Sequence, residues 1–171
     1  MTEHTKHEEF FDMVSLLEHE HEEILIKLTE LEKLVWDMGK SEVDYKTFGE
    51  IKEMIAAIHK RLFFNFTMEE DILFPDLNEV LPQQSSIPAM RVEHKEITEL
   101  CGKITEMVES KDILDKNKDK VEAEVITLID LVERAFHKKE NVMYHEAESM
   151  LSEAQLEELY NKMLKKYYKS N

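Results

Sequence analysis

Apolar residues recur every three or four positions in four long stretches of the chain. In the first stretch they are Phe10, Val14, Leu17, Ile24, Leu28, Leu31 and Val35. This spacing places them on one face of a helix, and that face is predicted to be buried. One position of the series is polar, because residue 21 is a histidine. An imidazole within an apolar face needs a hydrogen-bond partner, since burying it unpaired costs on the order of 1–3 kcal/mol.

The other three stretches also interrupt their apolar series with one polar residue each. They cover residues 48–77, 87–108 and 121–143. The polar residue is Glu70 in the second stretch, His94 in the third and Glu140 in the fourth. Four long helices with short connections are typical of an antiparallel four-helix bundle, so we predict an all-α protein of that architecture. In such a bundle the two imidazoles and two carboxylates could share one layer.

The connections and the C-terminal end follow from local signals. Asp44 is a predicted N-cap for the second helix, and the segments 82–88 and 110–120 are predicted loops. Ser152 and Gln155 have the spacing of a capping box, which predicts a short fifth helix over about residues 152–168.

The chain also contains an internal repeat. His21 recurs as His94 with an offset of 73 residues, and Glu70 recurs as Glu140 with an offset of 70. The repeat predicts a bundle with pseudo-twofold symmetry, in which the first and third helices are equivalent and so are the second and fourth.

Composition limits the classes of protein that the chain can represent. Its 171 residues, 42% of them hydrophobic, fit a single domain over 1–171, with the bundle at about 10–150. Three glycines and three prolines are too few for the turns of a many-stranded sheet. The formal net charge of −16 would repel nucleic acid and anionic membrane surfaces.

Sequence signals for export and redox chemistry are weak. We find no signal peptide and no apolar stretch long enough to span a bilayer, so the cytoplasm is the expected compartment. The single cysteine, Cys101, lies in an apolar series and is predicted to be a buried small hydrophobe. No phosphate-binding loop or nucleophile motif is present in the sequence.

The four inward-facing polar residues allow three chemical interpretations. They could form two buried histidine–glutamate hydrogen-bonded pairs, although such pairs seldom stabilise a core more than apolar packing does. They could bind a metal ion, because His and carboxylate side chains projecting from bundle helices form di-iron and di-manganese sites. They could also bind haem, with His21 and His94 as axial ligands and Phe66 and Phe136 against the macrocycle. We favour metal binding.

The same residues give the sequence a family resemblance. It resembles the hemerythrin-like, HHE cation-binding family over roughly residues 10–150. The matching features are Glu20-His21 before Ile24, Glu69-Glu70-Asp71-Ile72-Leu73-Phe74-Pro75, Glu93-His94 before Ile97, and Lys139-Glu140-Asn141 before Tyr144. The resemblance implies a four-helix bundle with a non-haem di-iron site, and roles in oxygen or nitric oxide binding, iron sensing or repair of iron centres.

The sequence departs from the family pattern at two expected ligands. In the family, the second and fourth helices usually carry His-x-x-x-Glu. Counting back four residues from Glu70 and Glu140 gives Phe66 and Phe136. These phenylalanines are therefore predicted to form pocket walls in place of two ligands. His137, three residues before Glu140, is a candidate substitute at the rim of the site.

We therefore predict a metal site formed by His21, Glu70, His94 and Glu140, with His137 as a candidate fifth ligand. The expected cofactor is mononuclear or dinuclear non-haem iron, with haem as the alternative. A reduced ligand set leaves coordination positions for a small diatomic ligand, so the expected function is binding or sensing. A redox enzyme that acts on peroxide or nitric oxide is the alternative from another class.

Overall fold

The computed structural model describes residues 10–81 and 86–170, and within these residues it is helical with no strand. The predicted all-α class is confirmed. Two π-helical turns, η2 (Glu69–Leu73) and η3 (Lys139–Met143), connect α2 to α3 and α5 to α6. The helices are α1 (Met13–Asp37), α2 (Tyr45–Met68), α3 (Phe74–Val80), α4 (Ile87–Met107), α5 (Lys111–Lys138), α6 (Tyr144–Met150) and α7 (Glu153–Ser170).

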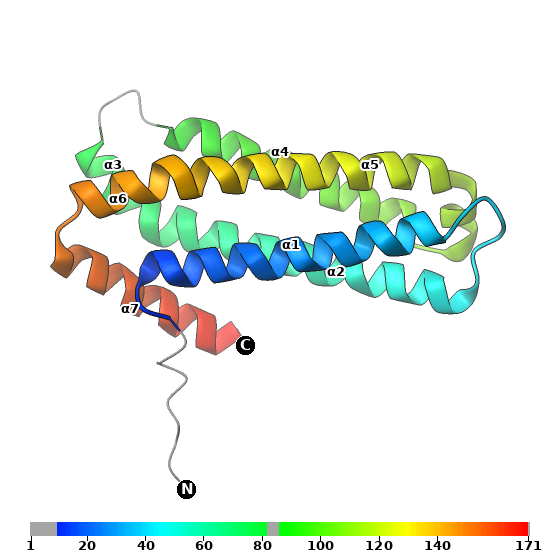
Figure 1. The fold of residues 1–171 in the computed structure, drawn as a ribbon, viewed down its shortest axis with the longest axis horizontal. Helices are drawn as coiled ribbons and strands as arrows, with labels where there is room; N and C mark the ends of the chain where they lie inside the picture. Colours follow the sequence, from blue (N-terminus) through cyan, green and yellow to red (C-terminus); the bar gives the residue numbers. More distant parts are fainter. Residues whose placement is uncertain (1–9, 82–85, 171) are drawn as a thin grey trace, which may run out of the picture.

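The four long helices lie side by side along a common direction (Figure 1). α1 packs against α2 and α5, and α4 packs against the same two helices. This packing is consistent with the predicted four-helix bundle. The C-terminal helix α7 lies beside the beginning of α1, outside the four (Figure 1).

Buried apolar residues form two clusters along the bundle. One cluster contains Ile24, Leu28, Ile55 and Leu128, and the other contains Leu17, Phe74 and Met163. His21, Glu69, His94 and Lys139 lie at positions in the chain where one cluster gives way to the other. The helix seams thus bury apolar side chains on both sides of one polar layer.

The predicted helix caps are present. Asp44 accepts a hydrogen bond from the Thr47 backbone N–H at 2.7 Å, which satisfies one of the free donors at the start of α2. Before α7, Ser152 and Gln155 bond to each other's backbone N–H groups at 3.1 and 2.9 Å. The capping box and the fifth helix are therefore confirmed.

The loop predicted over residues 110–120 is wrong. Ser110 caps a helix that begins at Lys111, with its hydroxyl accepting from the Ile113 N–H at 3.2 Å. Leu114 is buried, and Asn117 (φ −121°, ψ 16°) marks a kink without ending the helix. The charged residues that suggested a loop lie on the first turns of this helix, and most of them are exposed or only partly buried. Of the predicted loop at 82–88, residues 82–85 lie outside the described residues, and Ile87 begins α4.

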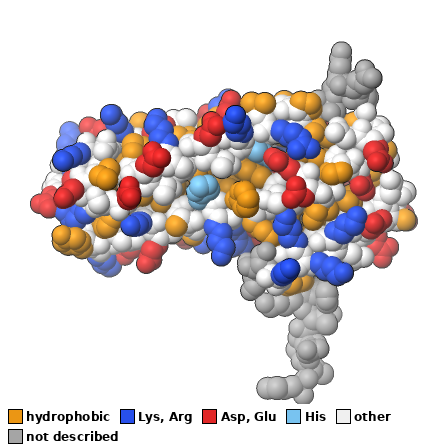
Figure 2. Space-filling view, turned by 180° about the vertical axis from the view of Figure 1, so that it is seen from behind, with side chains coloured by type: hydrophobic (Ala, Val, Ile, Leu, Met, Phe, Trp, Pro, Cys, Tyr) orange, Lys and Arg blue, Asp and Glu red, His pale blue; other side chains and the backbone are white. Residues whose placement is uncertain are grey.

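The surface agrees with the composition. In the view of Figure 2, Lys and Arg side chains are interspersed with Asp and Glu, so the negative net charge does not form one continuous acidic field on this face. No helix in the described part of the chain has the length and apolar character needed to cross a membrane. Cys101 is fully buried, as predicted, and burial raises the pKa of its thiol to about 12.

Candidate functional site

The two histidines predicted from the interrupted seams are both buried, and each is held by one glutamate. His21 Nδ1 lies 2.9 Å from Glu140 Oε1, and His94 Nδ1 lies 2.6 Å from Glu70 Oε1. An ionised carboxylate only accepts hydrogen bonds, so each Nδ1 donates to its glutamate and Nε2 faces the interior of the layer. The structure thus brings the four predicted residues together as two histidine–glutamate pairs.

The predicted burial of the glutamates is wrong. The side chains of Glu70 and Glu140 are 31% and 37% exposed, whereas that of the neighbouring Glu69 is 0% exposed. An alternation of three and four allows the buried residue between Phe66 and Leu73 to be either 69 or 70. The π-helical turn that begins at Glu69 selects the first of these, because its wider turn redirects the side chains that follow.

The Glu69 carboxylate lies at the centre of the layer. Its Oε1 accepts a hydrogen bond from the Tyr144 hydroxyl at 2.6 Å. Its Oε2 lies 2.7 Å from Lys139 Nζ and 3.1 Å from His94 Nε2. His21 Nε2 lies 3.8 Å from Oε1 and 3.1 Å from the Tyr144 hydroxyl. Both inward-facing imidazole nitrogens therefore converge on one carboxylate.

Lys139 supplies the positive charge of the layer. Its side chain is 0% exposed, and Nζ lies 4.7 Å from the Phe66 ring centroid and 5.4 Å from that of Phe136. These distances are within the range of cation–π contacts. Sequence reasoning missed this lysine, although two signals could have found it: it follows Phe136 by three residues, and it follows Glu69 by the repeat offset of 70.

The two phenylalanines lie against the imidazoles. The Phe66 ring stacks on His94 with centroids 3.9 Å apart, and the Phe136 ring stacks on His21 at 3.7 Å. Both rings are buried. They cover one face of each imidazole and lie against the Lys139 ammonium.

Charge coupling in the layer favours an ionised Glu69 and a neutral Tyr144. Burial raises the pKa of the Glu69 carboxyl, but the Lys139 ammonium and the adjacent imidazoles of His21 and His94 outweigh it and hold that pKa well below the usual value. Burial lowers the pKa of Lys139, and the Glu69 charge opposes this effect. Burial and the Glu69 charge raise the pKa of Tyr144 well above its usual value. Lys139 and Glu69 therefore form a buried ion pair.

Because Glu69 and Lys139 are the buried residues, and not Glu70 and Glu140, different residues lie one helical turn before them. Counting back four residues from Glu69 gives Asn65, and counting back from Lys139 gives Ala135, so Phe66 and Phe136 are not at these positions. Asn65 is fully buried, and neither polar atom of its amide has a hydrogen-bond partner in the structure. A family pattern of His-x-x-x-Glu would place a histidine at Asn65.

His137, the candidate fifth ligand, lies away from the layer. Its side chain is exposed, and its Nδ1 lies 3.1 Å from the Asn141 amide nitrogen one helical turn further on. The position one residue past Phe136 therefore faces solvent, and the structure does not bring His137 together with the other four.

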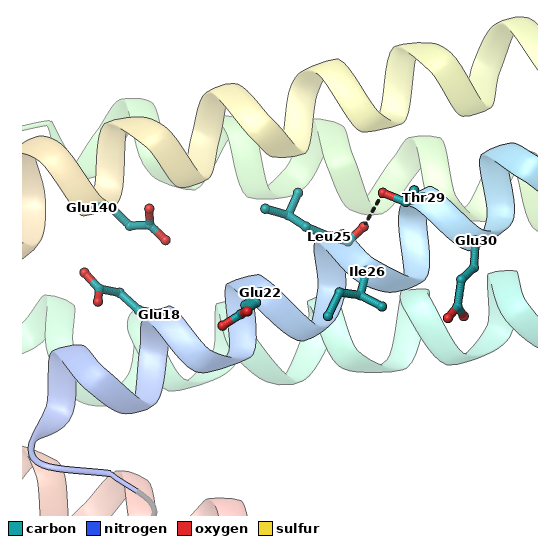
Figure 3. Close-up of a pocket in the computed structure, with 7 residues that line it drawn as sticks. All are labelled: Glu18, Glu22, Leu25, Ile26, Thr29, Glu30 and Glu140. Carbon is teal, nitrogen blue, oxygen red and sulfur yellow. Dashed lines mark hydrogen bonds between the residues drawn. The ribbon is translucent and has the colours of Figure 1, made fainter.

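A surface pocket of about 670 Å³ lies outside the His21–Glu140 pair, between α1 and the η3 turn that follows α5 (Figure 3). Glu18, Glu22 and Glu140 line it, and the carboxylates of Glu18 and Glu140 point toward each other (Figure 3). Burial and the charge of Glu140 raise the pKa of Glu18. A cation approaching this pocket would meet a concentration of negative charge.

The equivalent opening on the other side of the layer has a different charge. A pocket of about 430 Å³ is lined there by Phe66, Glu70, Arg91 and His94. Arg91, which stands at the repeat position of Glu18, has a guanidinium nitrogen 3.8 Å from Glu70 Oε2. The pseudo-twofold repeat is thus broken electrostatically, and the side with Glu18 is the more acidic.

The inward-facing donors do not fit two metal ions. Ferritin-like di-iron sites in bundles take about six protein ligands, four of them carboxylates. This layer offers two imidazole nitrogens, one carboxylate and one phenol, and it contains an ammonium group that has no lone pair to donate. Within residues 10–81 and 86–170, no three His, Cys, Asp or Glu side chains are arranged to hold a metal ion.

The donors fit one ion better than they fit haem. Two imidazoles and one carboxylate are a recognised ligand set for a single non-haem iron. His94 Nε2 and Glu69 Oε2 are buried without a well-formed hydrogen bond, so both inward-facing atoms have a lone pair free for a cation. A haem held by both imidazoles would have to lie where the Glu69 carboxylate lies, between the two Nε2 atoms.

Comparison with known proteins identifies the family of the chain. The family model described as the hemerythrin HHE cation-binding domain matches residues 12–147, which contain all the residues of the layer. A comparison with curated proteins finds no match.

Proposed function

Because the chain belongs to the hemerythrin HHE cation-binding domain family, whose members bind metal, we propose that it is a binding or sensing protein that takes one metal ion in its polar layer. Iron is the metal expected from the family. The proposed ligands are His21 Nε2, His94 Nε2 and the Glu69 carboxylate, with the Tyr144 oxygen beside them.

The observation that carries this proposal is the orientation of the two imidazoles. Metal-binding histidines commonly donate their second N–H to a carboxylate, which fixes the tautomer and directs the other nitrogen at the metal. Glu140 and Glu70 hold His21 and His94 in this manner, and both Nε2 atoms lie within 4 Å of Glu69, at 3.8 and 3.1 Å. A structural pair of hydrogen bonds alone would not require a shared inner carboxylate.

This proposal gives Glu70 and Glu140 an orienting role. Direct ligation by Glu70, Glu140 or His137 stays a prediction, and it is less favoured because the first two engage the imidazoles through Nδ1 and the third is exposed. An ion held by so few protein donors would supply open coordination positions, which the binding of oxygen or nitric oxide requires. The acidic pocket beside Glu18 would attract cations to the face of the bundle at Glu140, which holds His21.

Cobalt(II) titration of the metal-free protein tests the proposal, because the visible absorption of cobalt reports nitrogen and oxygen ligation. We expect saturation at one ion per chain and loss of the signal in Glu69→Gln. Asp71→Asn is the matched control, because Asp71 lies two residues away with a 68% exposed side chain and should leave binding unchanged. Cobalt binding that Glu69→Gln and His94→Ala leave unaltered would refute the proposed site.

A further inference from the structure

The repeat makes the centre of the layer asymmetric in charge. The offset of 70 residues relates Glu69 to Lys139, and the two begin equivalent π-helical turns, η2 and η3. A symmetric layer would contain two carboxylates, which would repel each other unless a cation lay between them. This chain has one carboxylate and one ammonium at these positions, so the layer is electrically balanced by its own residues.

The Lys139 ammonium lies among the groups that would bind a cation. Nζ is 2.7 Å from Glu69 Oε2, and the Nε2 atom of His94 is 3.1 Å from the same oxygen. The side chain is fully buried and covered by the rings of Phe66 and Phe136. Removing such an ammonium from the layer would leave the Glu69 charge without its nearest counter-charge.

We propose that Lys139 is a tethered cation that competes with metal for the Glu69 carboxylate. With no metal bound, its ammonium neutralises Glu69 and closes the layer. Metal binding requires Nζ to withdraw from Oε2, so the affinity for metal is lowered by the free energy of the ion pair. This inference rests on the proposed function and names the residue that regulates the same site.

Substitution of Lys139 by leucine separates competition from structure. Leucine is apolar, suits the contacts with Phe66 and Phe136, and cannot bind metal. Lys138→Leu is the matched control, because Lys138 is the neighbouring lysine and pairs with Glu93 at the surface with its side chain 54% exposed. Both variants are titrated with cobalt(II) alongside the wild type, and thermal unfolding is measured in chelator.

We expect Lys139→Leu to bind cobalt(II) at least about tenfold more tightly than the wild type, a typical size for coupling between two binding events. Its metal-free form should unfold at a lower temperature than that of Lys138→Leu. Saturating cobalt(II) should raise the unfolding temperature of Lys139→Leu and remove this difference. Lys138→Leu should match the wild type in affinity. If Lys139→Leu does not fold, Lys139→Gln, which also removes the charge, serves in its place.

The outcomes distinguish this inference from the proposed function. Equal affinities of wild type and Lys139→Leu, both abolished by Glu69→Gln, would overturn the competition and leave the metal site standing. Binding by Lys139→Leu alone would support the competition and overturn metal binding by the wild type. Failure of every variant to bind cobalt(II) would overturn both.

Discussion

Neutralising either member of the Lys139–Glu69 pair should be more destabilising than neutralising both. Glu69→Gln keeps the shape of the side chain and an acceptor for Tyr144, but it leaves a fully buried ammonium without its counter-charge. Breaking a buried ion pair in this way costs about 3–5 kcal/mol. Lys139→Leu leaves the buried carboxylate without its ammonium and is expected to cost about 3 kcal/mol, because the Tyr144 and His94 contacts to Glu69 remain.

The double variant Glu69→Gln/Lys139→Leu has no buried charge at either position, so its free energy of unfolding should lie within about 1–2 kcal/mol of the wild type. The coupling between the two substitutions is then about 4 kcal/mol or more, which is above the usual range of about 0.5–3 kcal/mol for pairwise terms. Urea unfolding followed by circular dichroism, at pH 7 and with chelator present, measures this cycle.

A surface pair provides the control cycle. Lys138 and Glu93 form an ion pair with side chains 54% and 23% exposed, so Glu93→Gln and Lys138→Leu should couple by less than about 1 kcal/mol. In the Glu69/Lys139 cycle, a double variant whose loss in free energy of unfolding equals the sum of the two single losses would refute this prediction. Additivity would mean that the buried charges do not compensate each other.

Three further predictions concern contacts elsewhere in the chain. Cys101, fully buried with a pKa of about 12, should not react with a thiol reagent at pH 8 until urea unfolds the protein, and labelling of the native protein within the mixing time would contradict this. Arg61→Ala should cost about 2 kcal/mol in urea unfolding, because Arg61 donates two hydrogen bonds at 3.2 Å to the buried Glu20, whereas Arg134→Ala removes an exposed pair and should cost less than about 1 kcal/mol. Hydrogen bonds from the Val43 N–H and Lys111 lower the pKa of Asp115 below 3.8, so the contribution of this carboxylate to stability is present above that value and lost as the pH falls through the lowered pKa. Asp115→Asn, which keeps an acceptor for Val43, should therefore flatten the loss of stability below pH 4, and an unchanged acid limb would count against the coupling.

The fold could be predicted from the sequence because its helices have long, regular apolar seams. The series from Leu17 to Val35 is buried throughout, and His21, its one polar member, is buried as well. Charge content was a poor guide to the start of α5, since a helix with one inward-facing residue per turn has the same composition as a loop. Leu114, which is fully buried, was the inward-facing residue in that charged segment.

The site could be predicted only in part. His21 and His94 were found because a single polar residue interrupts a seam that is otherwise apolar. Glu69 and Lys139 were missed because a seam of alternating threes and fours does not distinguish residue 69 from 70, and the π-helical turns that decide it have no sequence signal of their own. A lysine at a seam position reads as a solvated residue until its partner is known.

The number of ions that the metal-free wild-type protein takes up from anaerobic iron(II) tests the central claim most directly. Native mass spectrometry counts these ions per chain. A layer with two imidazoles, one carboxylate and the competing Lys139 predicts one iron per chain, lost in Glu69→Gln. Two irons per chain would contradict the account, because the layer would then hold the dinuclear centre for which it lacks the donors. No bound iron at saturating concentrations would contradict the proposed metal site itself.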